Sequence, residues 1–142
     1  MAEPLSSYMQ KGNKMGFDLT AQDPQTEKGA FFRNNVWYWR PLWEFVYMYC
    51  REDIQKEVYK KGHENSGAFV PSDNAIKIGT KLQALILDGT VEGFEKRYEA
   101  ARKKRRQTDK DPSSISSSYP FSAKNVKDFS EFCINSGGFE IH

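Results

Sequence analysis

Histidine and cysteine are scarce in this chain of 142 residues, since each occurs only twice. Neither His63 and His142 nor Cys50 and Cys133 have the spacing of a metal site. Both cysteines have apolar neighbours in helical patterns, which favours free, buried thiols over a disulfide or a nucleophile. The chain also lacks a carboxylate cluster, a Walker loop, a dinucleotide fingerprint and a nucleophile elbow. The sequence therefore gives no positive support for an enzyme, and it predicts no metal and no cofactor.

Long apolar runs and a strong net charge are missing as well. No run reaches the roughly 18 apolar residues of a membrane-spanning helix, and no charged segment precedes an apolar one as in a signal peptide. These absences predict a protein that is soluble, not exported and without a membrane partner. The net charge is only +2, so the composition as a whole does not demand a nucleic-acid partner.

Aromatic side chains are abundant, and they concentrate between Phe31 and Val58, a stretch that holds all three tryptophans. Pro41 suits the first turn of a helix, because its missing N–H would have no partner there. Apolar residues follow at helical spacing: Trp39, Trp43, Val46, Cys50, Ile54 and Val58. The pattern predicts a long central helix that starts near Pro41, continues past Val58 and stops at Gly62.

The rest of the chain carries shorter signals of helix and strand. Caps, apolar faces and glycine stops predict further helices over residues 72–88, 90–101 and 122–134. Alternation at residues 16–21 and at the C-terminal tail predicts a small β element that joins the two ends. We expect a mainly α (α+β) fold, with about four helices in a single globular domain over residues 15–142. Residues 1–14 are expected to form a flexible leader, and residues 102–118 a mobile basic and serine-rich loop.

A binding site is predicted just before the central helix. Arg33, Asn34, Asn35, Trp37 and Arg40 lie where backbone N–H groups and the helix dipole favour an anion. An arginine fork could clamp a phosphate or carboxylate, and an aromatic ring could stack on a base. The same residues also allow a structural interpretation, in which an asparagine caps the helix and each arginine pairs with an acidic neighbour.

Two glycine-containing segments are further candidates for the same site. His63 and Asn65 belong to a loop with donors, acceptors and flexible backbone, which suits the wall of a ligand site or an ordinary connection between helices. Gly137 and Gly138 could allow a ligand to approach the backbone, or could simply end the preceding helix.

A basic run is the main departure from an even charge distribution. It comprises Lys96, Arg97, Arg102, Lys103, Lys104, Arg105 and Arg106, against the single acid Glu99. The last five of these could make weak, salt-dependent contacts with nucleic acid or with an acidic protein surface, or could form a solvated helix end. No aromatic residues are interleaved between residues 102 and 106, which disfavours stacking on single strands.

Four blocks resemble a family of small tailed-bacteriophage proteins that share an F-R-N-N-V-W-x-W-R-P-L-W block. In this chain they occupy residues 15–18, 32–43, 119–122 and 137–141. The resemblance covers residues 15–142 apart from the basic and serine-rich insert, and it implies an accessory protein in the cytoplasm of a bacterial host cell. Many members of that family carry a Cys-x-x-Cys knuckle between the third and fourth helices. This chain has Lys, Arg and Ser there instead, so a zinc role is not expected.

Two functions are compatible with these observations. The first is a non-enzymatic phage accessory protein that blocks or redirects a host protein. The alternative is a protein that binds a small anionic, nucleotide-like ligand and so sequesters a host signalling molecule. The aromatic excess of the central helix is also compatible with a homodimer interface.

Overall fold

The two ends of the described chain meet in one antiparallel sheet. In this computed structural model, which describes residues 16–108 and 119–142, β1 (Gly16–Ala21) pairs with β2 (Phe31–Asn35) and β4 (Gly138–Ile141). β3 (Ala68–Pro71) pairs with the other side of β4, and the order is β2-β1-β4-β3. The predicted pairing between the N-terminal strand and the C-terminal tail is confirmed. The predicted leader over residues 1–14 lies outside the described residues.

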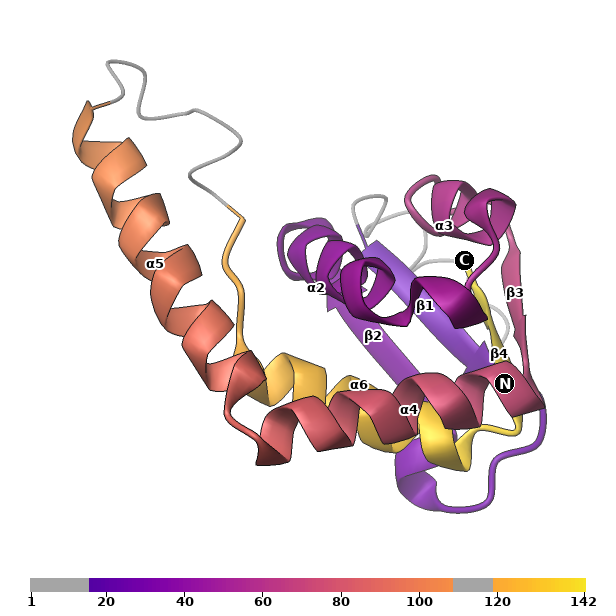
Figure 1. The fold of residues 1–142 in the computed structure, drawn as a ribbon. Coiled ribbons are helices and arrows are strands. Elements are labelled where there is room, and N and C mark those ends of the chain that lie inside the picture. The colour runs from indigo at the N-terminus through magenta and orange to yellow at the C-terminus, as the bar shows by residue number, and fades with distance from the viewer. Residues whose placement is uncertain (1–15, 109–118) are drawn as a thin grey trace.

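Helices make up most of the remaining structure, as Figure 1 shows, so the predicted mainly α fold is also confirmed. The α-helices are α2 (Val36–Cys50), α3 (Lys56–Gly62), α4 (Ser72–Leu87), α5 (Thr90–Thr108) and α6 (Ala123–Asn135). Of the two 3-10 helices, η1 (Glu27–Gly29) lies between β1 and β2, and η2 (Arg51–Asp53) lies between α2 and α3. Alternation along the strands turns Phe17, Leu19 and Phe139 into the core.

The central helix is shorter than the sequence predicts. α2 begins at Val36, where Asn35 caps it by accepting a hydrogen bond from the Tyr38 N–H at 3.1 Å, and it ends at Cys50. Ile54 has extended backbone, with φ −132° and ψ 112°, so the predicted continuation to Val58 is wrong. Ile54 nevertheless stays buried, because α2 and α3 pack on the same core. Apolar spacing therefore persists across a break in the helix.

Helix α5 is longer than the sequence predicts. Residues 102–108, expected to be part of a mobile loop, continue the helix to Thr108. Lys, Arg and Gln are good helix formers, and the Arg102 guanidinium pairs with the Glu99 carboxylate at 2.8 Å one turn earlier. The remainder of the predicted loop, residues 109–118, lies outside the described residues.

Aromatic rings form the centre of the core. Trp39 stacks on Trp43 with ring centroids 5.2 Å apart, and on Phe17 at 5.6 Å. Cys50 and Cys133 are buried and free, as their sequence patterns predict. Burial raises the pKa of the Cys50 thiol to about 12 and that of Cys133 well above its ordinary value, which disfavours the reactive thiolate.

Gly79 allows helices α4 and α6 to lie side by side, as Figure 1 shows. A Cβ at this position would lie 2.6 Å from Ile134 Cγ1 and 2.8 Å from the Ser130 carbonyl oxygen. In α5, a Cβ at Gly93 would meet nothing closer than the Arg97 guanidinium at 3.4 Å. The two glycines therefore form a matched pair, one required by packing and one not.

We predict that Gly79→Ala lowers the free energy of unfolding by about 1–3 kcal/mol, because α4 and α6 must separate. Gly93→Ala should be neutral or raise it by up to about 1 kcal/mol, through the higher helix propensity of alanine. Urea denaturation of both variants checks this expectation. Equal losses in the two variants would contradict the assigned packing.

Candidate functional site

Two buried indole groups place the end of α3 against α2. The Trp39 Nε1–H donates to the carbonyl oxygen of Gly62, and the Trp43 Nε1–H donates to that of Tyr59, each at 2.9 Å. The last carbonyls of a helix lack intrahelical partners, so they are available as acceptors. Gly62 allows this contact, since a Cβ there would lie 2.5 Å from Trp43 Nε1. The side chains of Tyr59 and His63 are thereby brought to the surface of α2.

A polar cluster results at this junction. The Glu44 carboxylate contacts His63 Nε2 at 2.8 Å and accepts a hydrogen bond from the Tyr59 hydroxyl. The Tyr59 ring stacks on Tyr47 at 3.9 Å, and the Arg51 guanidinium lies 5.0 Å from the centre of the Tyr47 ring. One carboxylate on α2 therefore contacts Tyr59 of α3 and His63, the C-cap residue of that helix.

Burial dominates the electrostatics of this cluster. It lowers the pKa of His63, and the contact with Glu44 opposes the shift without cancelling it. Within the described chain, the buried Nδ1 atom of His63 has no hydrogen-bond partner, which makes a proton there more costly. Burial, followed by the hydrogen bond to Glu44, raises the pKa of Tyr59 to about 12. The imidazole is therefore neutral near pH 7.

A cleft of about 420 Å³ opens beside the cluster, between α2, α5 and the segment that returns to α6. Its polar end is formed by Arg40, Glu44 and His63. Its apolar wall comprises Pro41, Phe45, Met48, Phe94, Tyr98 and Tyr119. The arrangement can bind an apolar group with a polar or charged end.

Aromatic packing holds the far wall of the cleft in place. Phe94 on α5 contacts Phe45 on α2, with ring centroids 4.9 Å apart. The Tyr98 hydroxyl donates to the Tyr119 carbonyl oxygen at 2.6 Å, and Phe121 packs on Phe45 at 5.2 Å. The start of α5 and the return segment are thus fixed to α2 by contacts among the residues that bound the cleft.

Two of the residues predicted to bind a ligand, Arg40 and His63, line this cleft together. The Arg40 guanidinium donates to the His63 carbonyl oxygen at 3.3 Å and lies 6.0 Å from the centre of the Phe17 ring. Within the described chain it has no carboxylate at ion-pair distance. Trp37 does not line the cleft; its exposed ring packs on Tyr119, which does, with ring centroids 5.2 Å apart.

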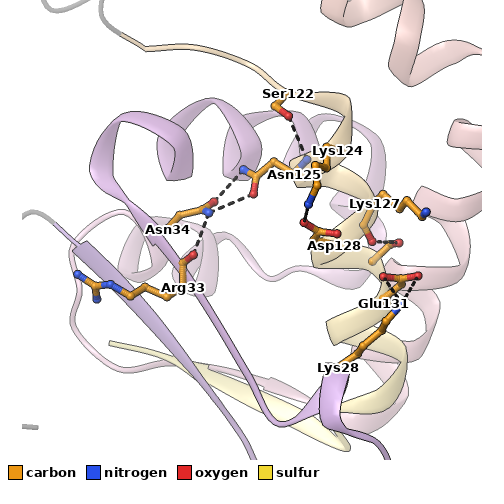
Figure 2. A network of polar contacts seen from close by, with 10 residues as sticks. Lys28, Arg33, Asn34, Ser122, Lys124, Asn125, Lys127, Asp128 and Glu131 are labelled. Carbon is orange, nitrogen blue, oxygen red and sulfur yellow. Dashed lines mark hydrogen bonds and ion pairs between the residues drawn. The ribbon is translucent and has the colours of Figure 1, made fainter.

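The other residues of the predicted Arg33–Arg40 block have structural partners. Arg33 pairs across the strands with Asp18, directly opposite in register, at 2.5 Å. Asn34 exchanges amide hydrogen bonds of 3.0 and 2.8 Å with Asn125, which joins β2 to α6 (Figure 2). Asn35 is the N-cap of α2. The cleft is not lined by any of these three side chains.

Further polar contacts of α6 add to the connection between this helix and β2. Figure 2 shows the Asn34–Asn125 pair, with Ser122 capping α6 by accepting from the Asn125 N–H at 3.2 Å. Further along the helix, Lys28 from η1 lies 3.3 Å from Glu131. These contacts fix α6 to β2 and η1 and give this region a structural role.

The remaining predicted residues lie elsewhere in the fold. Asn65 has a positive φ of 59° and donates to the Gly16 carbonyl oxygen at 2.9 Å. Gly137 and Gly138 have φ values of 71° and 98° at the turn from α6 into β4. A Cβ on Gly137 would lie 2.5 Å from the Asp23 carbonyl oxygen. All three residues serve turns, and none lines the cleft.

Seven residues of the cleft were not anticipated as site residues: Pro41, Glu44, Phe45, Met48, Phe94, Tyr98 and Tyr119. A local signal for two of them exists, because Glu44 and Met48 follow Arg40 at intervals of four on an otherwise apolar helix. The three aromatic residues of the far wall had no such signal, since aromatic residues in these segments usually indicate core.

In the described part of the chain, no group of three or more His, Cys, Asp and Glu residues could hold a metal ion. Among those same residues, no helix has both the length and the apolar character needed to cross a membrane. Comparison with known proteins finds no match among family models, curated proteins or solved structures. The geometry of the cleft is therefore the basis for inferring a function.

The lowered pKa of His63 predicts how the free energy of unfolding depends on pH. Unfolded histidine titrates near 6.5, so below about pH 6.5 the unfolded chain takes up a proton more readily than the native one. The free energy of unfolding should therefore fall as the pH drops from about 6.5 through the native pKa. His63→Gln should remove this component, whereas His142→Gln should retain it.

NMR titration of the imidazole C–H signals measures the same effect directly. The pKa of His63 should lie below about 6.5 in the native protein, and lower still in Glu44→Gln, which removes the carboxylate that favours the imidazolium. A higher pKa in Glu44→Gln than in the unmodified protein would contradict the assigned contact.

Proposed function

We propose that this protein is a non-enzymatic bacteriophage accessory protein that acts on a host factor, by binding a host protein in the cleft between α2 and α5. The observation that supports binding of a protein is the composition of the cleft, where one methionine and several aromatic rings surround a space of about 420 Å³. The phage setting rests on the sequence blocks that resemble tailed-bacteriophage proteins.

The apolar wall suits an anchor side chain from a partner. Met48 is 52% exposed although it lies on α2, the helix that supplies the buried rings of Trp39, Trp43 and Phe45. Methionine is flexible and polarisable, so it adapts to the shape of an incoming apolar group. Buried aromatic or aliphatic anchors contribute most of the binding energy at protein interfaces.

The polar end of the cleft would set the orientation of a bound segment. Arg40 and Glu44 carry opposite charges one helical turn apart, and both line the space next to the apolar wall. A bound segment that places a polar or charged group at this end and an apolar group at Met48 would satisfy both. Complementary charges of this kind set the orientation of a partner more than its affinity.

A charge placed in the apolar wall should abolish capture of the partner. We predict that Met48→Lys, used as an immobilised bait in a bacterial lysate, loses proteins that the unmodified bait retains. The affinity for a captured protein should fall about tenfold or more, because a lysine ammonium would be desolvated in the cleft. Quantitative mass spectrometry of the retained proteins measures this.

The matched control is Ile76→Lys, since Ile76 is 45% exposed on α4 and does not line the cleft. It makes the same change from an exposed apolar residue to lysine and should retain the partner. Equal losses with the two baits, or retention by Met48→Lys, would place the interaction outside the cleft.

A second candidate function is supported by Arg40. Its guanidinium lines the cleft without a carboxylate partner among the described residues, so an anionic group could pair with it. The corresponding proposal is that the cleft binds a small anionic, nucleotide-like ligand, stacked on the aromatic wall, and thereby sequesters a host signalling molecule. The volume of the cleft lies within the usual range of about 300–1,000 Å³ for small-molecule sites.

Thermal unfolding in the presence of mono-, di- and cyclic nucleotides tests this second proposal. A ligand at about a hundred times its Kd should stabilise the native state by about 2.7 kcal/mol and raise Tm by several degrees. Arg40→Gln should remove the shift, whereas Lys60→Gln, which deletes an exposed charge on α3, should keep it. A shift that survives in Arg40→Gln would contradict a role for this guanidinium.

A further inference from the structure

Two of the three acidic residues of α5, Glu95 and Glu99, lie on the side that faces the body of the protein. The Glu95 carboxylate accepts a hydrogen bond from the Ala123 N–H at 2.8 Å, at the start of α6. The Glu99 carboxylate pairs with Arg102 at 2.8 Å and lies 3.5 Å from the Phe121 N–H, which donates to it. These carboxylates therefore contact the segment that returns to α6, on the same side as the ring of Tyr98.

Helical geometry places a set of basic residues together on a different side of α5. At 100° per residue, positions 96, 97, 100, 103 and 104 share one side of the helix. They are occupied by Lys96, Arg97, Ala100, Lys103 and Lys104, all exposed, and we call this set the basic face of α5. None of the five is acidic, and only Glu92, at the start of the helix, lies 3.5 Å from Lys96.

The basic face is presented to solvent by the course of the helix. Figure 1 shows α5 extending away from the other helices, and the aromatic contacts that anchor it involve Phe94 and Tyr98 near its start. Residues 100, 101, 103, 104 and 105 are all exposed. The second half of α5 thus presents exposed basic side chains and no acidic one.

We propose that the basic face of α5 binds the phosphate backbone of a double-stranded nucleic acid. Lys96 and Lys103 are seven residues apart, which is about 10 Å along a helix and close to the rise of three base pairs of a duplex. Ala100 lies between them and leaves room for the helix to approach the backbone. Lys96, Arg97 and Lys103 supply the three cationic contacts on which the proposal rests.

The composition of the basic face favours a nucleic-acid duplex over a protein interface or a membrane surface. A protein interface has an apolar centre with few charges, and a membrane-surface helix needs large apolar side chains to insert. The basic face has alanine as its only apolar residue and therefore offers neither. It also lacks an aromatic ring for stacking on single-stranded bases, which favours a duplex.

The inference goes beyond the proposed function, because none of these side chains lines the cleft between α2 and α5. It also changes which residues of the basic run are expected to contact nucleic acid. Arg102 is turned toward Glu99 and the body of the protein, whereas Lys96 and Arg97, which precede residues 102–106, become central.

Salt-dependent binding of a labelled duplex tests the proposal. The probe is a fluorescein-labelled duplex of about 20 base pairs, as DNA and as RNA of the same sequence, titrated by anisotropy between roughly 25 and 200 mM KCl. The triple variant Lys96→Ala, Arg97→Ala, Lys103→Ala should bind about tenfold more weakly or worse at the lowest salt. Its slope of log K against log salt should be smaller by about 2.7, since each lost phosphate contact removes about 0.9.

The matched control is Lys56→Ala, Lys60→Ala, Lys77→Ala, which removes the same net charge from exposed positions on α3 and α4. It should keep the slope and nearly all of the affinity. Each single substitution on the basic face should reduce the slope by about 0.9, which provides the test even if the triple variant proves unstable. The Tm of every variant is measured in parallel.

Three results would overturn the inference. One is no duplex binding by the unmodified protein at roughly 50 mM KCl. Another is an equal loss of slope in the basic-face and control variants, which would indicate net charge alone. The third is binding to polyglutamate or to vesicles of anionic lipid as tight as to the duplex, which would point to an acidic protein or a membrane surface.

Discussion

The arrangement of this protein depends on the two buried indole N–H groups of α2, those of Trp39 and Trp43. A tryptophan buried as completely as Trp39 or Trp43 must find an acceptor for its N–H, because an unpaired buried donor is costly. The carbonyls of Tyr59 and Gly62 supply these acceptors at 2.9 Å. The same two bonds satisfy carbonyls at the end of a short helix that would otherwise lack partners. They fix the position of α3, and with it the polar end of the cleft.

The cleft arises because α2 has aromatic and apolar side chains on more than one side. One side, with Trp39 and Trp43, is buried in the core. Another side, with Phe45 and Met48, meets the start of α5 and the return segment at residues 119–121, and these elements do not fill the space completely. The apolar surface that remains is bordered by Arg40 and Glu44. A helix with this composition can therefore organise the core and expose an adaptable surface at once.

Several features of the fold were predictable because their causes are local. Alternating residues at both ends predicted β1 and β4, and the caps and glycine stops predicted α4 and α6 close to their observed bounds. The break after Cys50 was not predictable, since Ile54 and Val58 keep the helical spacing while their backbone belongs to a turn and a second helix. The candidate site was predictable in part. Arg40 and His63 do meet in the cleft, whereas Arg33, Asn34 and Asn35 are engaged by Asp18, Asn125 and the helix cap.

The sequence by itself determined the mainly α class, the approximate bounds of α4 and α6, the pairing of the chain ends and the aromatic centre of the core, because periodicity and capping act over a few residues. Only the tertiary structure decided which charged residues have partners. Asp18 lies close in sequence to Arg33, yet the strand register is what places them opposite each other. The contact between Glu44 and His63 depends on indole hydrogen bonds that span 16 and 23 residues. Contacts across such separations depend on how elements pack, and packing is not encoded in any short stretch of residues.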